Sequence, residues 1–204
     1  MSGTGSNDIL VRDRFVPAEQ TVSIPAMTEG RAPGATLHGG PLYRTPMIPI
    51  LLTAASTPVV GQARAVVDGF RECLSGRRRL FSATTQAENP AMQQRLASAT
   101  IEVGQIESLL REVVEDVMER RDSATVEDRA RWSSSFAHAV HRARAIIAEV
   151  AVASGGSAHF RNDPLQRAQR DANVAACHVA FDLDGQHELY GKVLLGLPPS
   201  GAIF

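Results

Sequence analysis

The sequence predicts a mainly α-helical protein, built as a four-helix up-down bundle that follows a short β remnant. Apolar side chains recur at helical spacing along four long stretches, and Pro, Gly and polar residues separate these stretches. Aromatic residues make up only 5% of the chain and hydrophobic residues 44%, with Ala, Val and Leu prominent. This composition suits closely packed helices better than a β-sandwich.

The composition also argues against several classes of partner. A formal net charge of −1 gives no reason to expect nucleic acid or an acidic membrane surface. Two cysteines, Cys73 and Cys177, provide neither a disulfide framework nor a metal cluster. The opening SGTGSND is not a signal peptide, and the apolar stretch 48–60 is too short and too broken by prolines to span a bilayer. We therefore expect a cytoplasmic protein.

The first 45 residues differ from the rest. Residues 1–27 show short alternating segments around Ile9–Val11 and Thr21–Ile24, which predict the last strands of a larger middle β-domain. Residues 28–45 are rich in Gly and Pro and predict a linker loop. The helical-bundle domain is expected over residues 46–204.

Proline and capping residues indicate where the first three long helices lie. The first helix is predicted from about 46 to 77, and Pro58 is expected to kink it or to mark where its regular part begins. Asn89–Pro90 starts a second helix, because Asn is a good N-cap and Pro suits the first turn. Thr125 starts a third, with Asp128 placed to reach back as in a capping box.

The fourth helix starts at Asp163–Pro164 and carries a face of small residues. We expect His178 to lie on this face, two turns beyond Arg170, where small neighbours let a ligand or another helix approach. A last short helix is predicted from about Asp184 to Leu195.

Five short motifs occur in a characteristic order: GTGSND, GRRRLF, SGGS, PLQRAQRDANVAACH and GLPP. Together they resemble the C-terminal half of the acyl-CoA dehydrogenase superfamily, and most closely its reduced-flavin-dependent, two-component monooxygenase branch. The resemblance implies that the first half of the family's chain is missing here, so that this chain alone is expected to be inactive.

The resemblance also implies a function. It implies hydroxylation of an aromatic, phenolic or similar small substrate with O2 and a reduced flavin, FADH2 or FMNH2, delivered by a separate flavin reductase. It further implies a homo-oligomer, most simply a tetramer.

Two sets of cofactor-binding residues follow from the same resemblance. Arg78 and Phe81 match an Arg-x-x-Phe motif that meets flavin across a subunit interface, where a guanidinium pairs with phosphate and an aromatic ring packs on a ring. The alternative is a solvated basic run beside a core Phe. Gly155, Gly156 and Ser157 match a loop at the flavin phosphates, and the alternative is a plain helix-ending glycine turn.

His178 is the predicted catalytic residue. It matches a histidine eight residues after an Arg, near the flavin's reactive edge, and there it can deprotonate a phenol or hold a peroxide by a hydrogen bond. The alternative is a core histidine with one helix partner. No metal site is predicted, because His138 and His141 lie three residues apart without a third ligand.

Two other functions remain open at this point. An acyl-CoA dehydrogenase takes its catalytic carboxylate from a Tyr-Glu-Gly-Thr motif in many members, and here Glu188 precedes Leu189–Tyr190–Gly191 in the wrong order. The last possibility is a non-catalytic helical fragment that only oligomerises.

Overall fold

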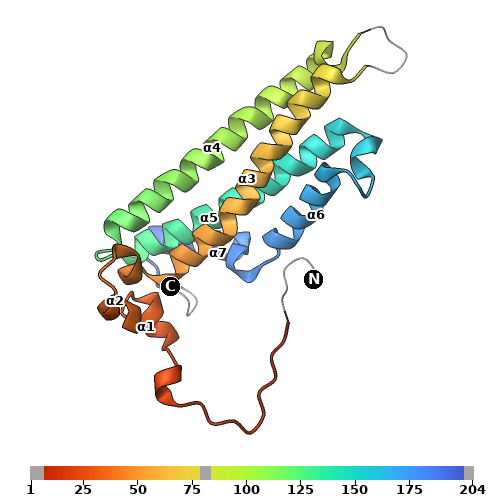
Figure 1. The fold of residues 1–204 in the computed structure, drawn as a ribbon. Coiled ribbons are helices and arrows are strands. Elements are labelled where there is room, and N and C mark those ends of the chain that lie inside the picture. The colour runs from red at the N-terminus through yellow and green to blue at the C-terminus, as the bar shows by residue number, and fades with distance from the viewer. Residues whose placement is uncertain (1–6, 79–83, 200–204) are drawn as a thin grey trace.

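The structure, a computed structural model, describes residues 7–78 and 84–199. Long helices dominate it and confirm the mainly α prediction (Figure 1). They are α3 (Met47–Gly76), α4 (Pro90–Arg120), α5 (Val126–Ser154), α6 (Pro164–Ala176) and α7 (Leu183–Leu194). From α3 to α6, consecutive helices run in alternate directions.

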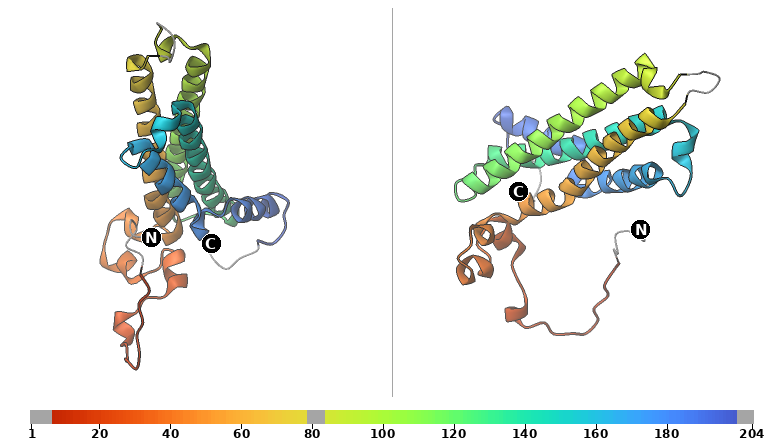
Figure 2. Two further views of the ribbon diagram at one scale, coloured as in Figure 1. Left: turned by 90° about the vertical axis from the view of Figure 1, so that its right-hand side faces the viewer. Right: turned by 45° about the horizontal axis from the view of Figure 1, so that its top comes forward.

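Helix α5 lies at the centre of this arrangement, in contact with α3, α4, α6 and α7 (Figure 2). Apolar residues therefore face inward around most of its circumference, and Trp132 and Phe136 are almost fully buried. The indole Nε1 of Trp132 donates to the carboxylate of Asp116 on α4 over 2.6 Å. This bond satisfies a polar group that would otherwise be costly to bury.

Local capping interactions start the helices where the sequence predicts. Asn89 accepts a hydrogen bond from the backbone N–H of Ala91 at 3.1 Å. Thr125 and Asp128 form the predicted capping box, with the Asp128 carboxylate accepting the backbone N–H of Thr125 at 2.8 Å. Asp163 accepts the N–H of Leu165 at 2.8 Å and so caps α6.

Helix α3 continues without interruption through Pro58 and is much longer than the apolar stretch 48–60. By length and composition it is the one helix among the described residues that passes a test for a membrane-spanning segment. This is weak evidence, because core helices of soluble proteins pass the same test. Here 39% of its most apolar 18-residue stretch is buried within the protein. Val60, Val67 and Phe70 of the same helix belong to the core.

The expected strands are not formed in residues 7–27. This segment has no regular secondary structure except for a 3₁₀ turn at Ala18–Gln20 and the start of α1 (Ile24–Thr28), and the chain bends at Asp13. Ile9 and Phe15 are 88% and 90% exposed, because no neighbouring strand is present for them to pair with. The predicted linker 28–45 contains α2 (Pro33–Leu37) and a 3₁₀ turn at Pro41–Arg44.

Candidate functional site

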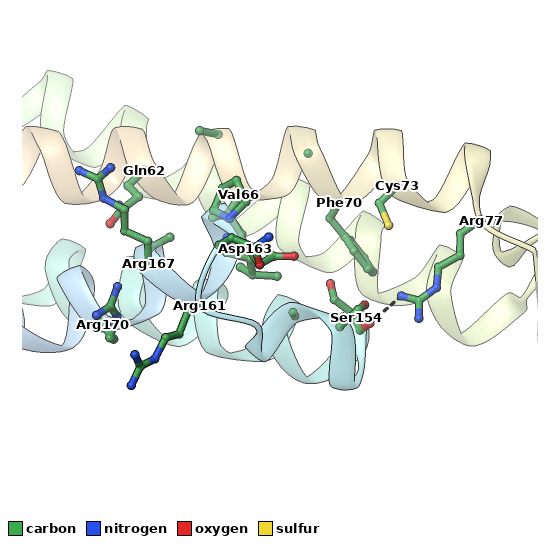
Figure 3. A pocket seen from close by; sticks show the side chains of 18 residues that line it. Gln62, Val66, Phe70, Cys73, Arg77, Ser154, Arg161, Asp163, Arg167 and Arg170 are labelled. Carbon is green, nitrogen blue, oxygen red and sulfur yellow. Dashed lines mark hydrogen bonds between the residues drawn. The ribbon is translucent and has the colours of Figure 1, made fainter.

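A cavity of about 740 Å³ lies between α3 and the segment that runs from the end of α5 into α6 (Figure 3). Its size is within the usual range for small-molecule and cofactor sites. Helix α3 contributes an apolar wall that includes Val66 and Phe70, and α6 contributes Leu165. One side of the cavity is therefore suited to a ring or another apolar group.

The rest of the lining is strongly basic. Four arginines line the cavity, Arg77, Arg161, Arg167 and Arg170, against a single carboxylate, that of Asp163. Asp163 already accepts the N–H of Leu165 as the α6 N-cap. The donor set therefore suits an anionic group such as a phosphate.

Arg77 is the best-anchored of these arginines. It is the C-cap residue of α3, and its Nη1 donates to the carbonyl oxygen of Ser154 over 2.8 Å. By contrast, Arg161 extends away from α3 in Figure 3, and Arg167 pairs with Asp171 of its own helix at 3.5 Å. Sequence reasoning missed Arg77, although it lies in the GRRR run that was singled out.

Unlike Arg77, Arg78 of the predicted Arg-x-x-Phe motif is not part of the cavity lining. It is exposed just beyond α3 and forms an isolated β-bridge with Thr85. Phe81 lies outside the described residues. A contact of either residue with a flavin across a subunit interface stays a prediction.

The glycine pair ends α5. Gly155 adopts a φ of +73°, which favours glycine, and its N–H donates to the carbonyl of Val152 at 3.2 Å. A Cβ at Gly155 or Gly156 would meet no atom within 4 Å, so the space beside both residues is open. Of the predicted loop residues, Ser157 lines the cavity. The segment is a helix-ending turn that lies next to the basic cavity.

His178 is not on a helix face, contrary to the sequence-based expectation. Helix α6 ends at Ala176, and two short-range bonds close its last turn, from the N–H groups of Cys177 and His178. His178 then has an extended conformation and is the N-cap of the 3₁₀ turn Val179–Phe181. Its side chain is exposed.

The structure does not place His178 beside the basic cavity. Asp163 starts α6 at the cavity, and His178 follows the other end of the same helix. At 1.5 Å per residue the two ends are separated by roughly 20 Å along the axis. Arg170, which also lines the cavity, is only eight residues from His178, so a ligand must be long only if it contacts both His178 and the Arg77 end of the cavity.

A histidine cluster lies where α7 packs on α5. The ring centroids of His138 and His187 are 5.8 Å apart, at a small cavity of about 290 Å³ that Tyr190 also lines. Partial burial and the neighbouring His187 lower the pKa of His138 below its ordinary value. In the part of the chain that the structure describes, no group of three or more His, Cys, Asp or Glu side chains is arranged to hold a metal ion.

Comparison with known proteins identifies the family. Residues 53–183, more than half of the chain, match the family model described as the acyl-CoA dehydrogenase C-terminal domain. The chain belongs to this family. The resemblance predicted from the motifs is thus confirmed.

Relatives of this acyl-CoA dehydrogenase C-terminal domain include a pigment production hydroxylase from Rhodococcus sp., 32% identical over 98% of this chain and 52% of the relative. Another is the flavin-dependent monooxygenase oxygenase subunit HsaA of Rhodococcus jostii, 31% identical over 97% of this chain and 53% of the relative. The chain spans about half the length of the curated relatives it matches.

Solved structures show the same fold. A 3-HSA hydroxylase from Rhodococcus sp. superimposes with a TM-score of 0.90 at 30% identity, over 99% of this chain and 53% of that one. Butyryl-CoA dehydrogenase from Megasphaera elsdenii superimposes with a TM-score of 0.60 at 16% identity, over 72% of this chain and 37% of that one, a likeness of fold alone.

Proposed function

We propose that this chain is the C-terminal half of the oxygenase component of a two-component, flavin-dependent monooxygenase that hydroxylates an aromatic or phenolic small molecule. The observation that carries the proposal is the similarity over almost the whole chain to proteins named as such components. These include HsaA and an FADH2-dependent resorcinol hydroxylase of Rhizobium sp. that is 26% identical over 98% of this chain and 52% of that protein.

The chemistry of the basic cavity fits a flavin nucleotide. Arg77 and the other lining arginines would hold the phosphates, and the apolar surface of Phe70 and Val66 would take a ring. When bound, the reduced flavin supplies the reaction with oxygen. Ser157, with Gly155 and Gly156 before it, would line the phosphate end, and Arg78 and Phe81 would act from a neighbouring subunit.

His178 is the proposed catalytic side chain. Its imidazole is exposed and does not fill a core position, so it is accessible to a substrate or a flavin brought to this end of α6. A ligand that reaches from Arg77, at one end of the cavity, past Arg170 to His178 would be an extended dinucleotide, or the site would be built from two protomers. We therefore propose FADH2 as cofactor, with FMNH2 as the alternative, and a homotetramer.

A separate flavin reductase would supply the reduced flavin, since the related proteins are named as the oxygenase part of such systems. We propose a cytoplasmic location for the complex. An acyl-CoA dehydrogenase activity is the competing assignment, but the chain lacks the Tyr-Glu-Gly-Thr carboxylate motif, and the likeness to butyryl-CoA dehydrogenase is one of fold alone.

The first experiment measures flavin binding by the 204-residue chain, through fluorescence quenching with FAD and FMN, together with the mass in solution. Binding of FAD by an oligomer is the expected result. Failure of a folded oligomer to bind either flavin would contradict the assignment of the cavity and favour a non-catalytic fragment.

The second experiment tests catalysis in a reconstituted enzyme, with reduced FAD, oxygen and a panel of phenols. Hydroxylated product is expected, and His178→Ala should lower the product formed per flavin oxidised without changing the oligomer. An unchanged ratio would remove His178 from the mechanism. Oxidation of acyl-CoA with an electron acceptor, and no phenol product, would overturn the monooxygenase assignment.

A further inference from the structure

The 3₁₀ turn Val179–Phe181 connects α6 to α7 and holds His178 at its start. Phe181 is only 2% exposed and anchors the turn in the core. Two backbone bonds close the turn, from Phe181 N–H to the His178 carbonyl at 2.8 Å and from Asp182 N–H to the Val179 carbonyl at 3.2 Å. The position of His178 therefore depends on how firmly this turn is attached to the helices around it.

His141 on α5 forms a hydrogen bond that links the turn to the central helix. This half-buried side chain places its Nε2 at 2.9 Å from the carbonyl oxygen of Phe181, 40 residues further along the chain. A carbonyl oxygen only accepts hydrogen bonds, so Nε2 of His141 carries the proton and donates it. The bond joins the central helix directly to the segment that carries His178.

A second bond determines which ring nitrogen of neutral His178 carries the proton. Its Nδ1 is 3.2 Å from the backbone N–H of Ala180 and accepts from it. When one nitrogen of a neutral imidazole accepts, the other carries the proton, so Nε2 of His178 is an N–H donor. To act as a general base through Nε2, the ring would have to move its proton to Nδ1 and lose the bond to Ala180.

We propose that His141 is a positioning residue for His178: its bond to the Phe181 carbonyl holds the turn that keeps His178 as an exposed Nε2–H donor. The turn thereby favours the donor role of His178, aimed at an oxygen or nitrogen acceptor of a bound ligand, over the role of a base that deprotonates a phenol. The consequence for catalysis rests on the proposed function. The bond that holds the turn and the position of the proton on the His178 ring do not.

The test uses the full chain with His141→Leu, which removes the donor at similar volume, and His141→Gln, whose amide can donate to the same carbonyl. NMR measures solvent exchange of the Ala180 and Asp182 amides and the ¹⁵N shifts of the His178 ring, without flavin. Loss of one neutral hydrogen bond should speed exchange at these amides roughly 2- to 12-fold in the Leu variant. The Val140 amide within α5 should be unchanged, and the Gln variant should recover most of the loss.

Two results would overturn the proposal: exchange that is unaffected in His141→Leu, or a wild-type His178 ring protonated on Nδ1 and not on Nε2. In the reconstituted enzyme, product per flavin oxidised should fall in the Leu variant and recover in the Gln variant, with flavin affinity unchanged. If wild-type enzyme makes no hydroxylated product, the proposed function fails, and the exchange rates and ring shifts still decide the positioning role of His141.

Discussion

Arg77 and Ser154 join the ends of two helices that line the basic cavity. The guanidinium Nη1 of Arg77, at the end of α3, donates to the backbone carbonyl of Ser154, the last residue of α5, over 2.8 Å. A guanidinium has five N–H donors, and this bond uses one of them. The bond thus holds a positive charge at the cavity while leaving donors that can face a phosphate.

Arg77→Met should therefore weaken binding of FAD roughly 10- to 100-fold, the usual effect of losing a hydrogen bond between charged groups. Fluorescence titration measures the affinity. Arg71→Met is the matched control, because it removes the same charge from an exposed side chain of α3 outside the cavity lining. Arg78→Met tests separately the proposed contact of Arg78 with flavin from a neighbouring subunit. A larger loss in Arg78→Met than in Arg77→Met would instead support the predicted flavin contact across a subunit interface.

Asp116 should be important for stability, because its Oδ2 accepts from Trp132 Nε1 at 2.6 Å and from Arg131 Nη2 at 2.5 Å. Trp132 is 1% exposed, so Asp116→Leu leaves a buried N–H without an acceptor and should lower the free energy of unfolding by about 2 kcal/mol. Asp116→Asn keeps an acceptor and should cost less.

Urea unfolding followed by circular dichroism measures both Asp116 variants. Glu115→Leu on the exposed face of α4 is the control, expected to change the free energy of unfolding by at most about 0.5 kcal/mol. Equal destabilisation by Asp116→Leu and Glu115→Leu would mean that the bond to Trp132 contributes nothing.

Asp128 should make the protein sensitive to acid. Burial by itself raises the pKa of its carboxyl, but the hydrogen bonds from Thr125 and the positive charge of Arg120 more than offset this, so the pKa lies below the ordinary value of 3.8. A carboxyl with a lowered pKa stabilises the fold above its unfolded-state pKa, and the contribution is lost as the pH falls further.

We therefore expect the free energy of unfolding of the wild type to fall as the pH drops below about 4. This fall should be steeper than that of Asp128→Asn. Urea midpoints at pH 5 and pH 3 provide the comparison. At neutral pH the variant should be less stable by about 1 kcal/mol, since Asn lacks the charge that strengthens the capping box and pairs with Arg120. Parallel pH curves for the two proteins would contradict the role of the ionised carboxylate.

His138 should make the packing of α7 depend on pH near neutrality. Partial burial, then the charges of His187, Arg142 and His141, lower its pKa below 6.5. Arg142 in turn is paired with Glu102 of α4. Because the folded state binds the proton less readily than the unfolded state, stability is fully present above about pH 6.5 and is lost as the pH falls.

Unfolding free energies at pH 7.5 and pH 5.5 should accordingly differ more in wild type than in His138→Gln. His159→Gln removes an imidazole from the turn after α5 and serves as the control. If the unfolding free energy of His138→Gln differs between pH 7.5 and pH 5.5 as much as that of the wild type, groups other than His138 cause the pH dependence.

Some of this structure could be read from short stretches of sequence. Asn89, Thr125 and Asp163 mark helix starts correctly, because each side chain bonds to a backbone N–H no more than three residues away. His178 was misplaced for a related reason. The small-residue periodicity runs on past Ala176, yet the chain leaves the helix to place Phe181 in the core, and that position exists only in the folded protein.

The sequence by itself determined the family, the four long helices, the short last helix and the capping residues of three of these helices, since all of these depend on motifs and on contacts between near neighbours. Only the tertiary structure decided that Arg77 lines the cavity and Arg78 does not, and that His141 holds the turn at His178. These outcomes depend on how α3 and α6 cross α5, which packing between distant segments sets. The N-terminal segment shows the same dependence, because a strand forms only against a partner that supplies its hydrogen bonds.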